Sequence, residues 1–362
     1  MRGAAVSCAA SQDLAPTRRV LVVRLDSVGD VLLAGPAVRA VAADAEVWLL
    51  CGPQGAPGGA LLPGVAAVRV WDCPWITAPA RPVDTAGVDA LSAILEECRP
   101  DEVVILTSFH QSPLPLALLL RLAGIRRITG ASVDYAGSLL DVRLRPGEDF
   151  DEDQPEAERA LAVVAAAGYA LPDSDDGRLA VLPTPDVSAL VGDGPYVVVH
   201  PGAAVPARAW PAENAAAAVE LLAERGFRVV VTGGPGEREL TARVAGASGV
   251  DLGGRCDLAG LSGVLAGADA VIVGNTGPAH LAAAVGAPVV SLFAPVGPAV
   301  RWAPYRVPTV LLGDQHAACA LSRARECPVP GHPCLAGVTA TAVANACAQL
   351  VARPRVPAEA LS

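Results

Sequence analysis

The stretch Ala270-Val-Ile-Val-Gly-Asn-Thr-Gly-Pro-Ala-His280-Leu-Ala-Ala-Ala284 contains the unit that decides the fold of this chain. Its aliphatic start predicts a buried strand over 270–273, and a short polar turn follows the strand. Pro278 stands where helices accept proline, at the first position, and the alanine-rich sequence after it predicts a helix over 278–285. A strand, a turn and a helix in this order form part of a parallel β-α-β arrangement.

The same order of strand, turn and helix recurs along both halves of the chain. Apolar runs predict strands at 20–24, 46–50, 67–70, 102–106, 127–129, 196–199, 228–231, 270–273 and 288–292. Alanine- and leucine-rich stretches predict helices at 31–43, 88–98, 113–123, 155–167, 212–225, 237–245, 258–266 and 278–285. Continuous aliphatic strands that alternate with helices indicate parallel sheets covered on both faces. We therefore predict an α/β protein with two Rossmann-like, doubly wound domains.

Residues 173–195 are rich in proline, aspartate and glycine, and this composition predicts a linker between the two domains. The division is then a loose extension (1–18), a first domain (19–172), the linker, a second domain (196–337), and a final helix with a tail (338–362) that could pack on either domain. Sheets of this kind bind ligands at the carboxyl ends of their strands, so we expect a site in the cleft between the domains.

Composition excludes several classes of function for these 362 residues. The hydrophobic fraction of 52% and the charged fraction of 18% are those of a folded protein, and 27 Lys plus Arg against 37 Asp plus Glu give a net charge of −10. That balance, without a dense basic run, argues against nucleic acid and against an anionic membrane as the main partner. No apolar run reaches the roughly 20 residues of a membrane-spanning helix, which leaves only peripheral contact with a membrane.

The first 17 residues make a poor secretory signal, and the nine cysteines are an odd number, five of them scattered singly. Both features favour a reduced compartment, so we expect a cytoplasmic protein. The segment from Cys327 to Cys334 fits either part of a metal site or an irregular loop, and no CxxC pair supports the metal.

The first informative turn is Arg24-Leu-Asp-Ser-Val-Gly-Asp30, which follows the first strand and opens a helix that contains Pro36. Asp30 has two interpretations. It is either the N-cap of that helix or a carboxylate placed at the cleft to accept a proton.

Two further turns follow strands of the second domain. His200-Pro-Gly-Ala-Ala-Val-Pro-Ala-Arg208 contains one cation in a small-residue loop, which fits either an anion cradle or a solvated arginine. Thr232-Gly-Gly-Pro-Gly-Glu237 places a carboxylate in the first turn of a helix, where it favours the helix dipole whatever else it does.

The fourth turn, Asn275-Thr276-Gly277 before His280, is the most specific. A helix N-terminus of this kind binds phosphate through its free amides and its dipole, although an ordinary strand-to-helix connection has the same appearance. His280 is either a ligand contact or a packing residue. The chain has no GxGxxG, GxxxxGK[ST], GxSxG or HExxH motif, which argues against the enzyme classes that carry them.

Taken together, the four turns and the segment 288–295 resemble, in order and spacing, the family 9 glycosyltransferases, the heptosyltransferases of lipopolysaccharide core assembly and their relatives. The resemblance covers about residues 19–350. It implies a GT-B architecture, with two Rossmann-like domains facing a cleft, and inverting sugar transfer without a metal or other cofactor. It also implies a nucleotide-diphosphate sugar of the ADP-linked type as donor, and a glycan or small-molecule hydroxyl as acceptor.

The resemblance gives each matching residue an expected role. Asp30 matches the base, Arg208 the phosphate-binding cation and Glu237 the ribose-binding carboxylate, while His200, Asn275, Thr276, Gly277 and His280 complete the donor-binding set. The backbone amides of Thr276, Gly277 and Ala279 are expected to face the diphosphate. First-domain loops, among them 108–113, would recognise the acceptor.

The chain departs from the family pattern in having Arg208 where lysine is usual and Asn275 where aspartate is common. These departures motivate one alternative, a catalytically silent nucleotide-sugar-binding module. A GT-B-fold sugar epimerase is another, but it needs more cleft carboxylates than the sequence offers. The sequence does not decide the oligomeric state.

Overall fold

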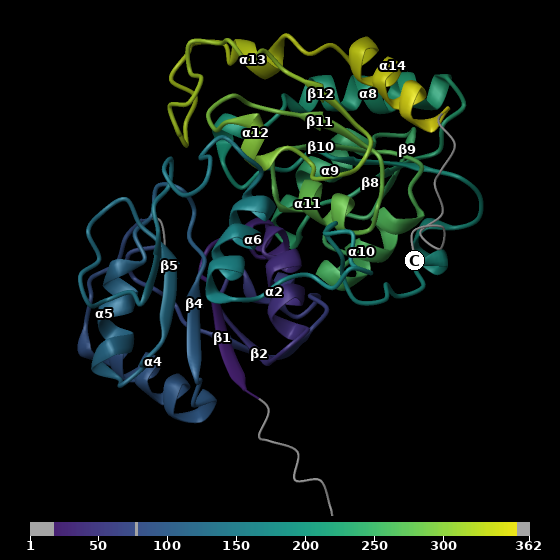
Figure 1. Cartoon of the computed structure of the whole chain (residues 1–362). Coiled ribbons are helices and arrows are strands. Elements are labelled where there is room, and N and C mark those ends of the chain that lie inside the picture. The colour runs from purple at the N-terminus through teal and green to yellow at the C-terminus, as the bar shows by residue number, and fades with distance from the viewer. Residues whose placement is uncertain (1–17, 77–78, 353–362) are drawn as a thin grey trace, which may run out of the picture.

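The computed structural model describes residues 18–76 and 79–352, which form two α/β domains, each built on a parallel six-stranded sheet (Figure 1). The predicted loose extension lies outside the described residues except for Arg18, and so does the tail beyond Ala352.

The first domain surrounds one sheet with helices. Its strands are β1 (Arg19–Arg24), β2 (Glu46–Cys51), β3 (Val65–Val70), β4 (Glu102–Ile105), β5 (Ile128–Ala131) and β6 (Val142–Leu144). Its helices are α1 (Val28–Leu33), α2 (Gly35–Ala42), α3 (Ala56–Gly59), α4 (Thr85–Cys98), α5 (Leu114–Leu122) and α6 (Glu156–Ala167). Val20 and Val22 of β1 join the core on one face of the sheet, and Leu21 and Val23 join the core on the other face. Both faces are therefore buried, which explains why the central strand is aliphatic throughout.

The second domain repeats this arrangement. Its strands are β7 (Val197–His200), β8 (Val229–Val231), β9 (Gly249–Asp251), β10 (Val271–Gly274), β11 (Val289–Leu292) and β12 (Thr309–Leu312). The helices from the linker onward are α7 (Ser188–Val191), α8 (Ala212–Glu224), α9 (Arg238–Ala245), α10 (Leu258–Gly267), α11 (Gly277–Ala284), α12 (Ala299–Trp302), α13 (Pro333–Ala336) and α14 (Ala340–Val351), with 3₁₀ turns at Pro206–Arg208 and Pro235–Glu237.

The two sheets have the same topology. Their strand orders are β3-β2-β1-β4-β5-β6 and β12-β11-β10-β7-β8-β9, so each half of the chain winds outward in both directions from its first strand. The winding direction changes between β1 and β4 and between β7 and β10. These are the switch points at which open α/β sheets bind ligands.

The predicted α/β fold with two doubly wound domains is confirmed. The differences from the predicted elements are local, and the structure also decides where the final helix packs. The predicted helix over 31–43 is two helices, α1 and α2, with Ala34 between them. The short edge strands β6, β9 and β12 were not predicted. Helix α14 packs against α8 and β11, so the final helix belongs to the second domain.

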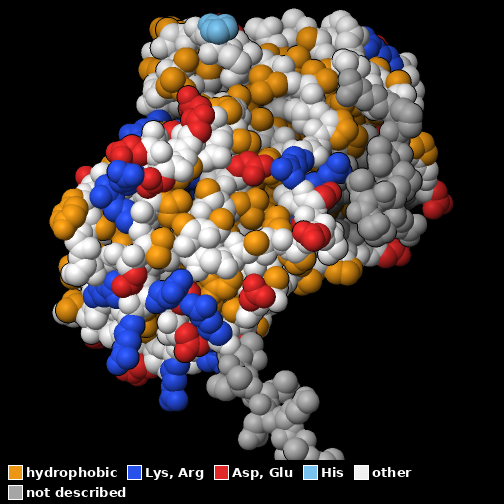
Figure 2. All heavy atoms as spheres, viewed as in Figure 1, with side chains coloured by type: hydrophobic (Ala, Val, Ile, Leu, Met, Phe, Trp, Pro, Cys, Tyr) orange, Lys and Arg blue, Asp and Glu red, His pale blue; other side chains and the backbone are white. Residues whose placement is uncertain are grey.

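Within the described ranges no helix is long and apolar enough to cross a membrane. Figure 2 shows arginine side chains gathered over the lower end of the first domain, with acidic side chains among them. Ion pairs at the starts of strands, Arg19 with Glu46 at 2.8 Å and Arg127 with Glu102 at 3.0 Å, neutralise part of this charge. This end of the sheet is opposite to the carboxyl ends of the strands.

Candidate active site at the domain interface

The N-termini of α1 and α11 meet where the two domains face each other. A Cβ on Gly29 would lie 2.7 Å from Cδ2 of His280, and a Cβ on Gly277 would lie 2.4 Å from Cγ1 of Val28. Real Cβ atoms do not approach so closely, so this contact requires glycine on both sides. Figure 1 shows α11 on the side of the second domain that faces the first. The four sequence turns are thereby distributed around one interface.

Asp30 is the third residue of α1, and its carboxylate is held by side chains from several parts of the chain. Oδ2 accepts a hydrogen bond from Ser27 Oγ at 2.7 Å, and Oδ1 accepts from Arg24 Nη2 at 3.1 Å and from Trp302 Nε1 at 3.4 Å. Burial opposes ionisation, but the Arg24 guanidinium and the Ser27 hydrogen bond outweigh it and hold the pKa of Asp30 below its usual value. The carboxylate is therefore charged at neutral pH.

The N-cap interpretation of Asp30 is wrong. The N-cap of α1 is Ser27, and the Asp30 carboxylate accepts from side chains rather than from the first-turn amides. The proton-acceptor interpretation is the one that remains.

Arg24 was quoted in the sequence motif but not predicted as a site residue. Its buried guanidinium lies 3.0 Å from Asp26, 3.1 Å from Asp30 and 3.5 Å from Glu156 of α6. Burial raises the pKa of Asp26 to about 6, although Arg24 opposes this shift. The sequence offered one sign that Arg24 belongs to the site: it is the last residue of a buried strand, and a charged side chain at that place needs partners. Glu156 gave no such signal.

Arg208 is not a solvated side chain. It ends the 3₁₀ turn after β7, and its Nε is buried without a hydrogen-bond partner in the described part of the chain. Burial lowers its pKa and the exposed Arg325 adds to the shift, while Asp30 opposes it. A buried cation with an unused donor is a binding feature for an anion.

The N-terminus of α11 offers fewer free amides than the sequence suggested. Thr276 N–H donates to Gly274 O at 2.8 Å and Ala279 N–H donates to Thr276 O at 3.0 Å, so the expectation that both face a diphosphate is wrong. Gly277 N–H has no acceptor among the residues that the structure describes. His280 is buried beside it, and burial lowers its pKa to about 4, while Asp30 opposes the shift. Its Nδ1 has no hydrogen-bond partner in the described ranges.

Asn275 is turned toward the neighbouring strand. Its amide donates to Ala294 O and accepts from Ala294 N, both at 3.4 Å, and the side chain is buried. An aspartate could accept from Ala294 N but could not donate to its carbonyl, which gives the departure from the family pattern a physical reason. This geometry makes Asn275 a positioning residue, and direct contact with a donor stays a prediction.

His200 and Glu237 lie at the ends of β7 and β8. His200 is buried, with Nδ1 3.0 Å from Thr232 Oγ1, and burial lowers its pKa. The Glu237 carboxylate accepts from Gly234 N at 2.7 Å and covers Gly202 so closely that a Cβ there would be 1.9 Å from it. Glu237 is thus held over the loop that leads to Arg208, where the predicted ribose contact remains open to test.

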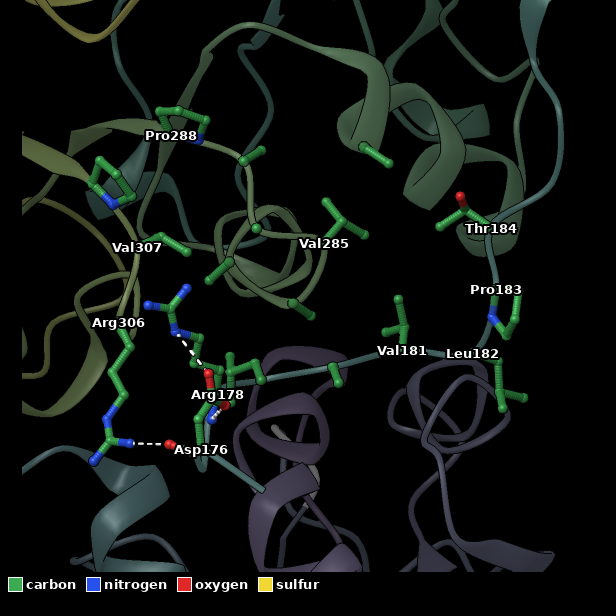
Figure 3. A pocket seen from close by; sticks show the side chains of 18 of the residues that line it. Asp176, Arg178, Val181, Leu182, Pro183, Thr184, Val285, Pro288, Arg306 and Val307 are labelled. Carbon is green, nitrogen blue, oxygen red and sulfur yellow. Dashed lines mark hydrogen bonds and ion pairs between the residues drawn. The ribbon is translucent and has the colours of Figure 1, made fainter. Parts of the chain in front are cut away.

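One cavity near the interface contains none of the predicted site residues. It has a volume of about 940 Å³ and lies between the linker segment 172–184 and the far end of α11, away from Gly277. Figure 3 shows Val181 and Thr184 of the linker with Val285 and Pro288 of the second domain around it. Among described residues, no three His, Cys, Asp or Glu side chains are placed to hold a metal ion, and the loop cysteines Cys319 and Cys334 are buried thiols.

The sequence model described as glycosyltransferase family 9 (heptosyltransferase) matches residues 102–332, which is more than half of the chain. The chain belongs to glycosyltransferase family 9. Membership makes this protein a glycosyltransferase that uses a nucleotide sugar, and it confirms the resemblance seen in the sequence.

Two curated relatives show how far the likeness to this family 9 enzyme extends. Lipopolysaccharide heptosyltransferase 1 of Pseudomonas aeruginosa is 34% identical over 194 residues, which cover 52% of this chain and about half (54%) of the relative. Lipopolysaccharide heptosyltransferase 1 of Escherichia coli is 27% identical over 300 residues, which cover 77% of this chain and 89% of the relative.

Solved structures support the fold. The family 9 glycosyltransferase of Veillonella parvula has a TM-score of 0.72 at 18% identity, covering 92% of this chain and 97% of its own. E. coli heptosyltransferase WaaC, solved with ADP-2-deoxy-2-fluoro heptose, has a TM-score of 0.64 at 23% identity, covering 90% and 98%. The GT-B architecture of the family 9 enzyme is therefore established.

Proposed function

We propose that this family 9 enzyme transfers a heptose or related sugar from an ADP-linked donor to a hydroxyl of a glycan or small-molecule acceptor, with inversion, without a metal, and in the cytoplasm. The observation that carries the proposal is Arg208, whose buried Nε has no hydrogen-bond partner among the described residues and which lies within the electrostatic influence of Asp30 across the domain interface. One side of the interface thus offers a proton acceptor and the other a cation for an anion.

The proposed step is a direct displacement. The acceptor oxygen attacks the anomeric carbon, the bond from that carbon to the diphosphate oxygen breaks, and the hydroxyl proton passes to Asp30. Because Arg24 keeps Asp30 ionised, the carboxylate is ready at neutral pH, and it accepts the proton as the new bond makes the hydroxyl more acidic.

The leaving diphosphate gains negative charge as its bond to the sugar breaks. Arg208 and the free Gly277 amide, at the positive end of the α11 dipole, would stabilise this charge. These groups supply the positive potential that a divalent metal supplies in other transferases, so the proposal requires no metal.

Asp30→Asn tests the proposal, because it keeps the size of the side chain and removes the proton acceptor. We expect a loss of transfer of about a hundredfold or more with little change in nucleotide affinity. The assay incubates the enzyme with ADP-heptose and other nucleotide sugars and follows nucleoside diphosphate release and the sugar product. An unchanged rate refutes the assignment of Asp30, an isomerised sugar identifies an epimerase, and binding without turnover identifies a silent module.

A further inference from the structure

A second cavity, of about 550 Å³, opens at the same domain interface. Phe109 and Asp153 of the first domain line one side, and the second domain contributes Pro298, Val300, Arg301, Leu321 and Arg323. The volume is within the range of small-molecule sites, roughly 300–1,000 Å³. None of the lining residues belongs to the predicted donor-binding set.

The cavity adjoins the proposed base through two aromatic rings. The rings of Phe109 and Trp302 are 5.7 Å apart between centroids, and Trp302 Nε1 donates to Asp30 Oδ1 at 3.4 Å. A molecule with a hydroxyl at Asp30 could therefore place its next group against Phe109. Phe109 belongs to the first-domain loop 108–113, where acceptor recognition was expected.

Apolar side chains are displayed to solvent at this cavity. Val300 is 47% exposed and Leu321 is 66% exposed. Leu321 and Arg323 also have left-handed backbone, with φ of 60° and 56°, a conformation that residues other than glycine rarely adopt. Hydrogen bonds of 2.8 Å from Leu321 N to Pro295 O and from Arg323 N to Val296 O hold the loop in this form. Unfavourable backbone maintained in this way is typical of ligand sites.

The two arginines of the cavity differ in their partners. Arg301 lies over the Phe109 ring at 4.3 Å, and it pairs with Glu152 at 3.0 Å and with Asp153 at 3.7 Å. Arg323 also lies over the Phe109 ring, at 5.9 Å, but it is exposed and forms no ion pair with any residue that the structure describes. The cavity thus combines an apolar wall with one cation whose charge is not neutralised.

We propose that this cavity is an acceptor subsite for an apolar aglycone that carries an anionic group, with the aglycone on Val300 and Leu321 and the anion at Arg323. This inference rests on the proposed function, since it names the acceptor class of the same site. An acceptor made only of sugars would leave the two aliphatic side chains in water. We place the aglycone directly next to the accepting sugar or alcohol, because Phe109 of the cavity packs on Trp302, which donates to Asp30.

Binding of small phosphate esters tests the subsite without any turnover. Phenyl phosphate, butyl phosphate and inorganic phosphate are titrated by ligand-observed NMR with ADP saturating, so that the donor site is occupied. We expect at least one ester to bind about tenfold more tightly than inorganic phosphate, because its apolar group leaves water. The preferred ester distinguishes a ring from an alkyl chain.

Matched variants locate the binding. Leu321→Ser should abolish the advantage of the ester, and Arg323→Gln should weaken both esters about tenfold, whereas Leu182→Ala, an exposed leucine of the other cavity, should change nothing. Esters that bind no better than inorganic phosphate, or that bind Leu321→Ser and Arg323→Gln as they bind the parent, overturn the subsite.

A kinetic measurement completes the test once transfer is established. The phenyl glycoside of an accepted sugar should have a lower KM than its methyl glycoside, and Leu321→Ser should remove this difference in KM. Equal KM values in the parent enzyme contradict the subsite. Absence of transfer to every acceptor contradicts the proposed function instead, so the two failures are distinguishable.

Discussion

Gly29→Ala should separate the two domains at the active site. The added methyl would stand 2.7 Å from Cδ2 of His280 and 3.2 Å from Cα of Gly277. Favourable carbon–carbon contacts are about 3.5–4.0 Å long, so α11 must retreat from α1 by roughly 1 Å. A misplacement of about 1 Å between reacting groups can cost on the order of a hundredfold in rate. We therefore expect kcat to fall by about that factor.

The assay compares kcat, ADP affinity and thermal stability between the variant and the parent. Alanine is favoured over glycine inside a helix by about 1 kcal/mol, so the local stability of α1 should not fall. The matched control is Gly87→Ala in α4, where the nearest atom to the new methyl is the Asp84 side chain at 3.3 Å. We expect this control to keep the parental kcat.

A double variant connects the loss to the contact. Combining Gly29→Ala with His280→Ala removes the nearer of the two close contacts but leaves the contact with Gly277 Cα. We therefore expect the double variant to recover part of the lost kcat, so that the effects of the two substitutions are not additive. A Gly29→Ala enzyme with parental kcat would show that the close approach of α1 and α11 is not needed for transfer.

Three further changes test separate parts of the site. Arg208→Ala should lower the rate of transfer by about a hundredfold. The parent enzyme should keep its activity in EDTA. Loss of activity in EDTA with rescue by Mg²⁺ would show that the proposed stabilisation of the leaving group is wrong. Burial lowers the pKa of His280 from 6.5 to about 4, so protonation of this side chain favours the unfolded state. The free energy of unfolding should therefore fall by about 3 kcal/mol as the pH falls from above 6.5 to 4. The free energy of unfolding of His280→Gln, measured with urea, should fall less over this pH range than that of the parent. Asn275→Asp should lower the free energy of unfolding by about 1–3 kcal/mol, because a carboxylate cannot donate to Ala294 O, and an unchanged urea midpoint would contradict the hydrogen bonds seen there.

Much of the fold was readable from the sequence because strand, turn and helix signals are local. Aliphatic runs predicted the central strands, and Pro278 marked the helix after β10. The same locality explains the omissions. The edge strands β6, β9 and β12 are mostly half-buried, and β6 and β9 contain the charged residues Arg143 and Asp251, so they lack the continuous aliphatic burial of the central strands.

Only the tertiary structure decided how the turns combine into one site. Trp302 reaches Asp30 across 272 positions of the chain, and Glu156 reaches Arg24 across 132. The contact of Gly29 with His280 likewise joins two domains. Such pairings depend on how buried faces pack, and a charge or a glycine in the sequence does not specify its partner. The sequence by itself therefore determined the two sheets and most of the strand ends at which the candidate site lies, while packing determined which side chains surround Asp30, Arg208 and the cavity beside them.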